Sequence, residues 1–117
     1  MNLGITSGTP VLIVLHSPRE KYWGLLDEIN SAGVFLRGLD LNSFDEWIRS
    51  VIHREAFVGP GSMFFPMWRV ERVAKDETVG GVTSLCAQVE QRTGFSLDEL
   101  LSGRHESLEG PDDGPLA

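Results

Sequence analysis

The sequence predicts a mainly β protein, with a small five-stranded barrel, a helical insertion between strands 3 and 4, and short C-terminal helices. Five short stretches rich in β-branched, aromatic and aliphatic residues are separated by turn-forming residues. One stretch instead repeats its apolar residues with the period of an α-helix. The third strand is apolar on both faces, which is typical of a strand covered on two sides. Short strands of this kind favour closure into a barrel.

Composition limits the chain to one ordinary globular domain. Of its 117 residues, 41% are hydrophobic and 23% are charged, values typical of a folded domain. Its 10 Lys and Arg residues against 17 Asp and Glu residues give a formal net charge of −7, which disfavours general binding to nucleic acid. We predict a single domain over 1–103 and an acidic, disordered tail over 104–117, where turn formers and acids dominate.

No segment is predicted to direct the chain to a membrane or to the secretory pathway. The apolar run at 11–15 is short and no basic residue precedes it, whereas a membrane span needs about 20 apolar residues. The single cysteine, Cys86, excludes an intramolecular disulfide and suits a reducing compartment. We therefore expect a cytoplasmic protein in which Cys86 is a small core residue.

The first two strands are predicted at residues 11–16 and 22–30. The first is rich in β-branched residues and is followed by Pro18, which stops a strand. The second alternates, so that three apolar side chains should share one face: Trp23, Leu25 and Ile29. We expect the two strands to pair as neighbours in an antiparallel meander.

The third strand is predicted at residues 34–41, after a turn at 30–33 in which Gly33 can adopt a positive φ. Its apolar side chains point to both faces: Val34 and Leu36 to one, and Phe35, Leu39 and Leu41 to the other. This strand should therefore be buried on both sides.

A helix is predicted at residues 43–54, the strongest signal in the chain. Five apolar residues repeat at helical spacing: Phe44, Trp47, Ile48, Val51 and Ile52. Ser43 and Glu46 form the pattern of a capping box, in which each side chain bonds a free amide of the first turn. We expect the apolar face to pack over the barrel or over a neighbouring subunit. As an alternative to helix capping, the polar residues near the start of this helix could form a cation site, because hard cations prefer oxygen ligands. These residues are Asp40, Asn42, Asp45 and Glu46.

The last two strands are predicted at 63–68 and 69–75, after a flexible loop at 59–62. Pro66 should end the fourth strand. Val70 and Val73 are three positions apart rather than two, so we expect a tight helical turn or a β-bulge near the junction of the two strands.

Two short helices are predicted over residues 83–102. Three apolar residues share one face of the first helix, which should end before Gly94: Leu85, Cys86 and Val89. The second helix should begin with a capping box formed by Ser96 and Glu99 and stop at Gly103.

Residues 10–75 resemble the Sm-like superfamily, which includes the Sm and LSm proteins and the bacterial RNA chaperone Hfq. The run Val70-Glu71-Arg72-Val73 looks like the paired apolar positions of the second Sm motif. The first Sm motif is matched by three segments: 11–15, 24–26 and 34–36. The run 64–73 looks like a bacterial branch of these barrels rather than a member with a known RNA. The resemblance implies a small barrel that assembles into rings through pairing of its outer strands.

The residues with which that family holds RNA are not matched in this chain. Sm proteins place an Asp-x-x-Met-Asn cluster after the second strand, where this chain has Asn30, Gly33 and Val34. Between the last two strands they place an Arg-Gly pair, and Hfq places a Lys-His pair, where this chain has Pro66-Met67. The helix at 43–54 is an insertion relative to the minimal fold. The RNA chemistry of the family therefore does not transfer to these positions.

No catalytic, metal-binding or cofactor-binding motif is present, so we expect a protein that is not an enzyme and holds no metal or cofactor. The chain lacks H-E-x-x-H, G-x-S-x-G, a CxxC pair and the phosphate-binding G-x-x-x-x-G-K-[ST]. We expect His16 and His53 at the surface. The sequence leaves open whether they converge with Asp27 or Glu28.

The function favoured by the sequence is a non-enzymatic binding or scaffold module that self-associates or engages a protein partner, with no membrane partner. The stretch 63–68 holds more large apolar side chains than one face of a short strand can bury, so either a subunit contact or the helix at 43–54 should cover the rest. An alternating strand would send Met63, Phe65 and Met67 to one face and Phe64, Pro66 and Trp68 to the other. The candidate contact residues are Met63, Phe64, Phe65, Met67 and Trp68. The alternative function is binding of RNA or single-stranded nucleic acid through a non-standard site. Its aromatic and basic candidates are Tyr22, Trp23, Arg37, Arg69 and Arg72.

Overall fold

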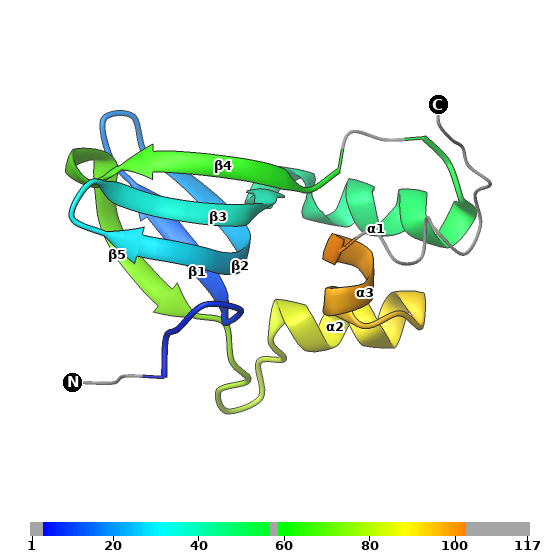
Figure 1. The fold of residues 1–117 in the computed structure, drawn as a ribbon. Coiled ribbons are helices and arrows are strands. Elements are labelled where there is room, and N and C mark those ends of the chain that lie inside the picture. The colour runs from blue at the N-terminus through cyan, green and yellow to red at the C-terminus, as the bar shows by residue number, and fades with distance from the viewer. Residues whose placement is uncertain (1–3, 57–58, 103–117) are drawn as a thin grey trace.

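The computed structural model describes residues 4–56 and 59–102, which contain one five-stranded antiparallel sheet (Figure 1). The strands are β1 Pro10–Leu15, β2 Glu20–Asn30, β3 Gly33–Asp40, β4 Gly61–Pro66 and β5 Val70–Lys75. Their order across the sheet is β4-β3-β2-β1-β5. The mainly β class and the five strands are thus confirmed. Within the described residues β4 and β5 lie at the two edges and the sheet is not closed, so the barrel stays a prediction.

The connection between β4 and β5 shows that the sheet is curled. These edge strands are joined only by a 3₁₀ turn, η2, at Met67–Arg69, which confirms the predicted helical turn after Pro66. Four Cα–Cα steps from Pro66 to Val70 span at most about 15 Å, whereas the edges of a flat five-stranded sheet lie about 19 Å apart. The two edges must therefore bend toward each other.

A close approach of β2 and β3 accompanies this curl. Gly24 lies directly opposite Gly38 in the ladder between the two strands. A Cβ atom on Gly24 would overlap the carbonyl oxygen of Arg37, and one on Gly38 would overlap the carbonyl oxygen of Trp23. The backbones are so near that no side chain fits at either position.

A register shift in β2 corrects one prediction. The ladder with β3 shifts between Leu26 and Glu28, which leaves Asp27 as the extra residue of a β-bulge. Trp23 and Leu25 both contribute to one core, as predicted. Ile29 is instead 46% exposed, so its predicted place on the same buried face is wrong. The bulge breaks the two-residue alternation on which that prediction depended.

The two faces of the sheet bury two separate cores. One face, here called the inner face, carries Leu26, Leu36 and Phe65. The opposite face, here called the helical face, carries Trp23 and Leu39, which pack with the helices. Because β3 supplies Leu36 to the first core and Leu39 to the second, the predicted burial of this strand on both sides is confirmed.

The predicted helix at 43–54 is observed as α1, Phe44–His53, which follows a 3₁₀ turn, η1, at Leu41–Ser43. Phe44, Trp47 and Ile48 are buried in the core of the helical face, with Val51 packed against it. The apolar face therefore covers the sheet of its own chain. Ile52 is 47% exposed, so the predicted five-residue stripe is wrong at its last position.

The capping box predicted at the start of α1 is wrong. Ser43 makes no side-chain capping hydrogen bond. The η1 turn takes up the residues before the helix, and Asp40 accepts the backbone N–H of Asn42 at 2.8 Å instead. Asp45, in the first turn of α1, pairs with Arg92 at 2.9 Å.

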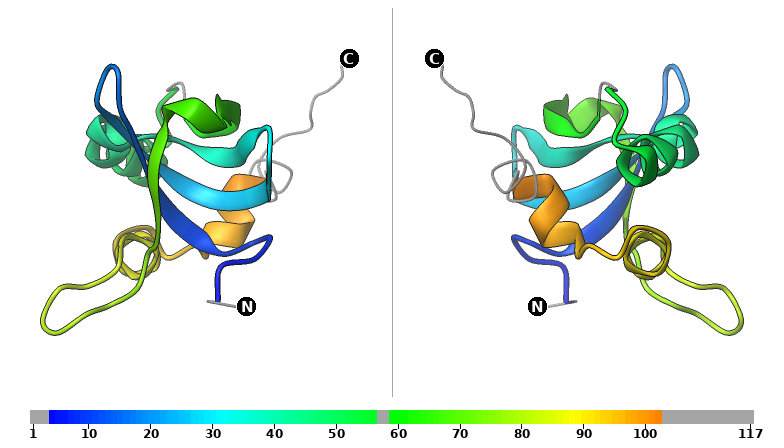
Figure 2. Two further views of the ribbon diagram at one scale, coloured as in Figure 1. Left: turned by 90° about the vertical axis from the view of Figure 1, so that its left-hand side faces the viewer. Right: turned by 90° about the vertical axis from the view of Figure 1, so that its right-hand side faces the viewer.

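Two further helices, α2 Leu85–Thr93 and α3 Leu97–Ser102, gather with α1 at one end of the sheet (Figures 1 and 2). Gly94 ends α2 with a φ of 82°, as predicted. The predicted capping box of α3 is confirmed: the Ser96 N–H donates to Glu99 Oε1 at 2.9 Å, and the Glu99 N–H donates to Ser96 Oγ at 3.1 Å. The predicted stop at Gly103 and the tail at 104–117 lie outside the described residues.

One carboxylate, Asp76, joins the sheet to α2. Its Oδ2 accepts the indole N–H of Trp23 at 3.0 Å and the backbone N–H of Cys86 at 2.8 Å. Its Oδ1 accepts the backbone N–H of Leu85 at 3.0 Å. Ser84 caps the same helix through the N–H of Ala87. Asp76 thus satisfies two free amides of the first helical turn together with the polar atom of a buried tryptophan.

We expect Asp76→Ala to lower the free energy of unfolding by about 2–4 kcal/mol, because three donors lose their acceptor in a partly buried place. Urea denaturation followed by tryptophan fluorescence measures this change. Asp45→Ala is the matched control: it removes an ion pair at the surface, where the expected loss is below about 1 kcal/mol. Equal losses in the two variants would contradict the role assigned to Asp76.

Candidate interaction surface

The edge of the sheet formed by β4 and η2 exposes three large apolar side chains. Phe64 is 45% exposed, Met67 36% and Trp68 67%. The helix α1, which packs on the helical face, does not cover them. Exposed apolar groups on an edge strand and on the turn that follows it are typical of a contact surface.

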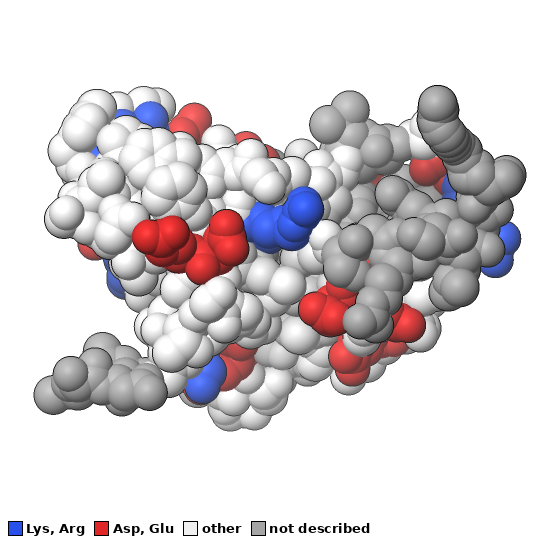
Figure 3. Space-filling model, viewed as in Figure 1, with Lys and Arg blue, Asp and Glu red and all other residues white. Residues whose placement is uncertain are grey.

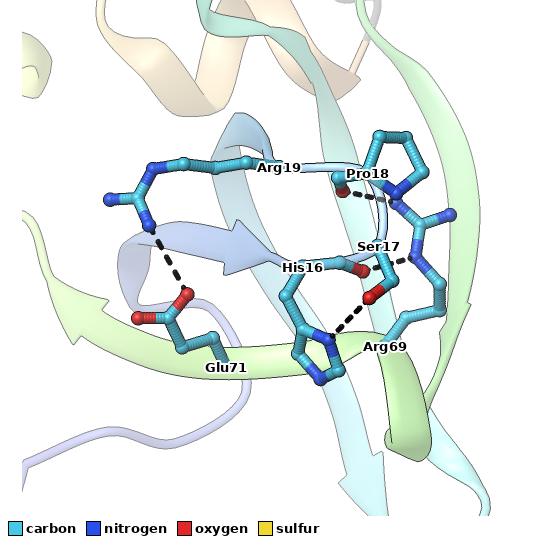
Figure 4. A network of polar contacts seen from close by, with 6 residues as sticks. All are labelled: His16, Ser17, Pro18, Arg19, Arg69 and Glu71. Carbon is cyan, nitrogen blue, oxygen red and sulfur yellow. Dashed lines mark hydrogen bonds and ion pairs between the residues drawn. The ribbon is translucent and has the colours of Figure 1, made fainter.

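The turn that presents Trp68 is held on both sides. Before it, the Met67 N–H donates to the carbonyl of Ala32 at 2.9 Å. After it, Arg69 donates through Nε to the carbonyl of His16 at 2.9 Å and through Nη2 to the carbonyl of Pro18 at 3.0 Å (Figure 4).

The same arginine also pairs with Glu20 at 2.8 Å, and its backbone carbonyl accepts the N–H of His16 at 2.9 Å. The guanidinium group is thus engaged with the β1–β2 hairpin. Trp68 stands on a backbone fixed at its neighbours, so little conformational freedom would be lost when a partner covers it.

The residues predicted to form this contact divide into two groups. Phe64 stacks on Phe35 with ring centroids 4.7 Å apart and lies outside the core. Phe65 points to the inner face, where it is 8% exposed and Met63 packs beside the same core. Phe65 is therefore not available to a partner.

Met67 does not follow the predicted alternation, because the strand ends at Pro66 and η2 begins at Met67. The candidate contact surface is therefore defined by Phe64, Met67 and Trp68.

The residues predicted to contact RNA do not form one surface. Trp23 is fully buried, so its ring has no face to offer a base. Tyr22 lies against Phe65 on the inner face, with ring centroids 4.8 Å apart. Burial raises the pKa of its hydroxyl, and Glu20 and Asp40 add to that effect.

The three arginines among those candidates are also apart. Arg69 is engaged with the β1–β2 hairpin. Arg37 and Arg72 are exposed, but they lie on β3 and β5, with β2 and β1 between these strands.

The described residues bring together no cluster of three His, Cys, Asp or Glu side chains that could hold a metal ion. The imidazole of His16 contacts the hydroxyl of its neighbour Ser17 at 3.2 Å. Cys86 packs against the core of the helical face, as predicted. Burial raises the pKa of its thiol, with Asp76 and Glu90 adding to the shift, which disfavours the reactive thiolate form.

No protein-family model, curated protein or solved structure matches this chain. The resemblance to the Sm-like superfamily therefore stays a prediction. Among the helices within residues 4–56 and 59–102, none has the length and apolar character needed to cross a membrane.

Proposed function

We propose that this protein is a self-associating binding or scaffold module with an Sm-like barrel. Its subunit contact is the surface of Phe64, Met67 and Trp68. The single observation that carries the proposal is the exposure of these three side chains on an edge strand and a firmly held turn. Unpaired strand edges invite pairing with another chain, and closed assemblies remove them.

The topology gives this contact a direction. β4 and β5 are the two edges of the sheet and each has six residues, so β4 of one copy can extend the sheet by pairing antiparallel with β5 of the next. In that arrangement the end of β4 lies beside the beginning of β5 in the neighbour. The η2 turn follows β4 and precedes β5 in each copy. Met67 and Trp68 of both copies therefore meet at one end of the paired strands. A head-to-tail contact of this kind closes into a ring when the rotation allows it.

We expect Trp68→Asp to lower the size of the oligomer in sedimentation velocity experiments while the chain stays folded, because a carboxylate placed in an apolar contact loses its hydration. Val79→Asp is the matched control. Val79 is 65% exposed, and it lies in the segment between β5 and α2 that projects from the body of the molecule (Figure 2). That variant should assemble like the unaltered chain, and circular dichroism should show both variants folded.

A strictly monomeric unaltered chain at high protein concentration would overturn this proposal, as would an oligomer that Trp68→Asp leaves intact. Nucleic-acid binding is less well supported, because Trp23 is buried, Arg69 is engaged within the chain and the net charge is −7. Submicromolar binding of labelled oligo-U that weakens with salt would favour it nonetheless.

A further inference from the structure

One end of the helical face is left open by the helices. Cross-strand partners in an antiparallel sheet point to the same face, and the register places Glu28 beside Phe35 and Phe35 beside Phe64. Arg37 lies two residues further along β3 on that same face. The three helices gather at the other end of the sheet, over Trp23 and Leu39 (Figure 1).

This open area carries a stacked aromatic pair with opposite charges beside it. Phe35 and Phe64 are in contact, and Phe64 is 45% exposed. Glu28 and Arg37 are both exposed. Figure 3 shows acidic and basic side chains next to each other below an uncharged surface on this side of the molecule. Arg37 forms no ion pair within the described part of the chain, and Glu28 accepts a hydrogen bond from Asn30 at 2.8 Å.

We propose that a second copy of this chain docks on this open area, face to face and about a two-fold axis. The axis passes between Glu28 and Arg37, so each Arg37 meets the partner's Glu28, and two such ion pairs form. Phe35 is the neighbour of both charged residues in the sheet and therefore lies near the axis, where it meets the partner's Phe35.

Charge is the reason that the occupant is a second copy. A partner with one sign of charge would repel either the adjacent acids Asp27 and Glu28 or Arg37, whereas a second copy offers both signs of charge at matching positions. Such a contact is isologous, since the same patch serves both subunits. It uses the sheet face rather than the strand edges and shares only Phe64 with the proposed edge contact, so it goes beyond that contact and does not depend on it. With both contacts present, two rings would stack with dihedral symmetry.

The test reverses the two charges one at a time in the Trp68→Asp background, where the proposed edge contact is removed. Arg37→Glu places two acidic residues opposite each other in a homodimer, and Glu28→Lys places two basic residues opposite each other. We expect each single reversal to raise the dissociation constant of the dimer about tenfold or more at low ionic strength. Sedimentation equilibrium measures these constants.

Mixing the two reversed chains is the decisive experiment. A heterodimer of Arg37→Glu with Glu28→Lys restores both ion pairs, so it should form about as tightly as the dimer with neither reversal. The double variant Arg37→Glu/Glu28→Lys should also recover self-association. Arg72→Glu makes the same charge change on an exposed residue of β5 and should leave the dissociation constant unchanged.

The face-to-face contact is wrong if the single reversals dimerise as well as the starting chain, or if the mixture binds no more tightly than either variant alone. It is also wrong if the Trp68→Asp chain stays monomeric at high concentration in low salt. In each case the edge contact is judged separately, by whether Trp68→Asp lowers the oligomer size of the unaltered chain.

Discussion

Gly24→Ala is expected to destabilise the protein by at least about 3 kcal/mol, the upper end of the usual cost of overpacking. The added methyl group would overlap the carbonyl oxygen of Arg37 and the Cα of Gly38. These are backbone atoms of the neighbouring strand, so relief requires β2 and β3 to move apart rather than one side chain to rotate. Equilibrium unfolding in urea, or the loss of folded protein on expression, measures the effect.

Gly61→Ala is the control for this substitution. Gly61 pairs with Gly38 in the β3–β4 ladder, but a Cβ atom built there meets nothing within 4 Å. Alanine at such a site restricts the unfolded chain, so we expect a stability change between zero and a gain of about 1 kcal/mol. If the two variants unfold at the same urea concentration, the close approach of β2 and β3 does not limit the fold.

The second large effect is expected for Trp47→Ala, at about 3–5 kcal/mol. Trp47 is 5% exposed and packs between Trp23 and Phe44, with ring centroids 6.1 and 6.2 Å away. Its removal leaves a cavity among large aromatic rings in the core between α1 and the sheet. Thermal and urea unfolding of the purified variant give the loss directly.

Ile52→Ala tests whether that loss comes from the core rather than from the helix itself. Ile52 lies on the same helix but is 47% exposed. Alanine is the better helix former, so we expect a change within about 0.5 kcal/mol, as for surface sites in general. A similar loss in both variants would contradict the assignment of the loss to the buried indole of Trp47.

The segment that carries the candidate surface could be predicted from the sequence, but the residues that form the surface could not. The apolar excess at 63–68 is visible in the sequence, and Phe64, Met67 and Trp68 are indeed exposed. The alternation of side chains along a strand predicted, however, that Met67 lies on the same face as Phe65. That prediction is wrong, because η2 begins at Met67. The open face with Glu28 and Arg37 was not predicted, since the bulge at Asp27 sets which side chains face Phe35.

Local patterns in the sequence determine the elements of this protein. Five apolar stretches bounded by turn formers give the five strands, and the period of the apolar residues gives α1. The pair Ser96 and Glu99 gives the capping box of α3. Each of these features depends on residues within a few positions of one another, so the order of the residues alone is sufficient to specify it.

Only the tertiary structure decides how those elements are joined. Trp23 donates a hydrogen bond to Asp76, 53 positions away in the sequence. Arg69 donates to the carbonyl of His16, which is also 53 positions away. Gly24 and Gly38 matter because they lie opposite each other in the curled sheet. The register of paired strands brings such residues together, and a single bulge changes it. Contacts between distant residues therefore depend on the whole sheet, and no local pattern in the sequence contains them.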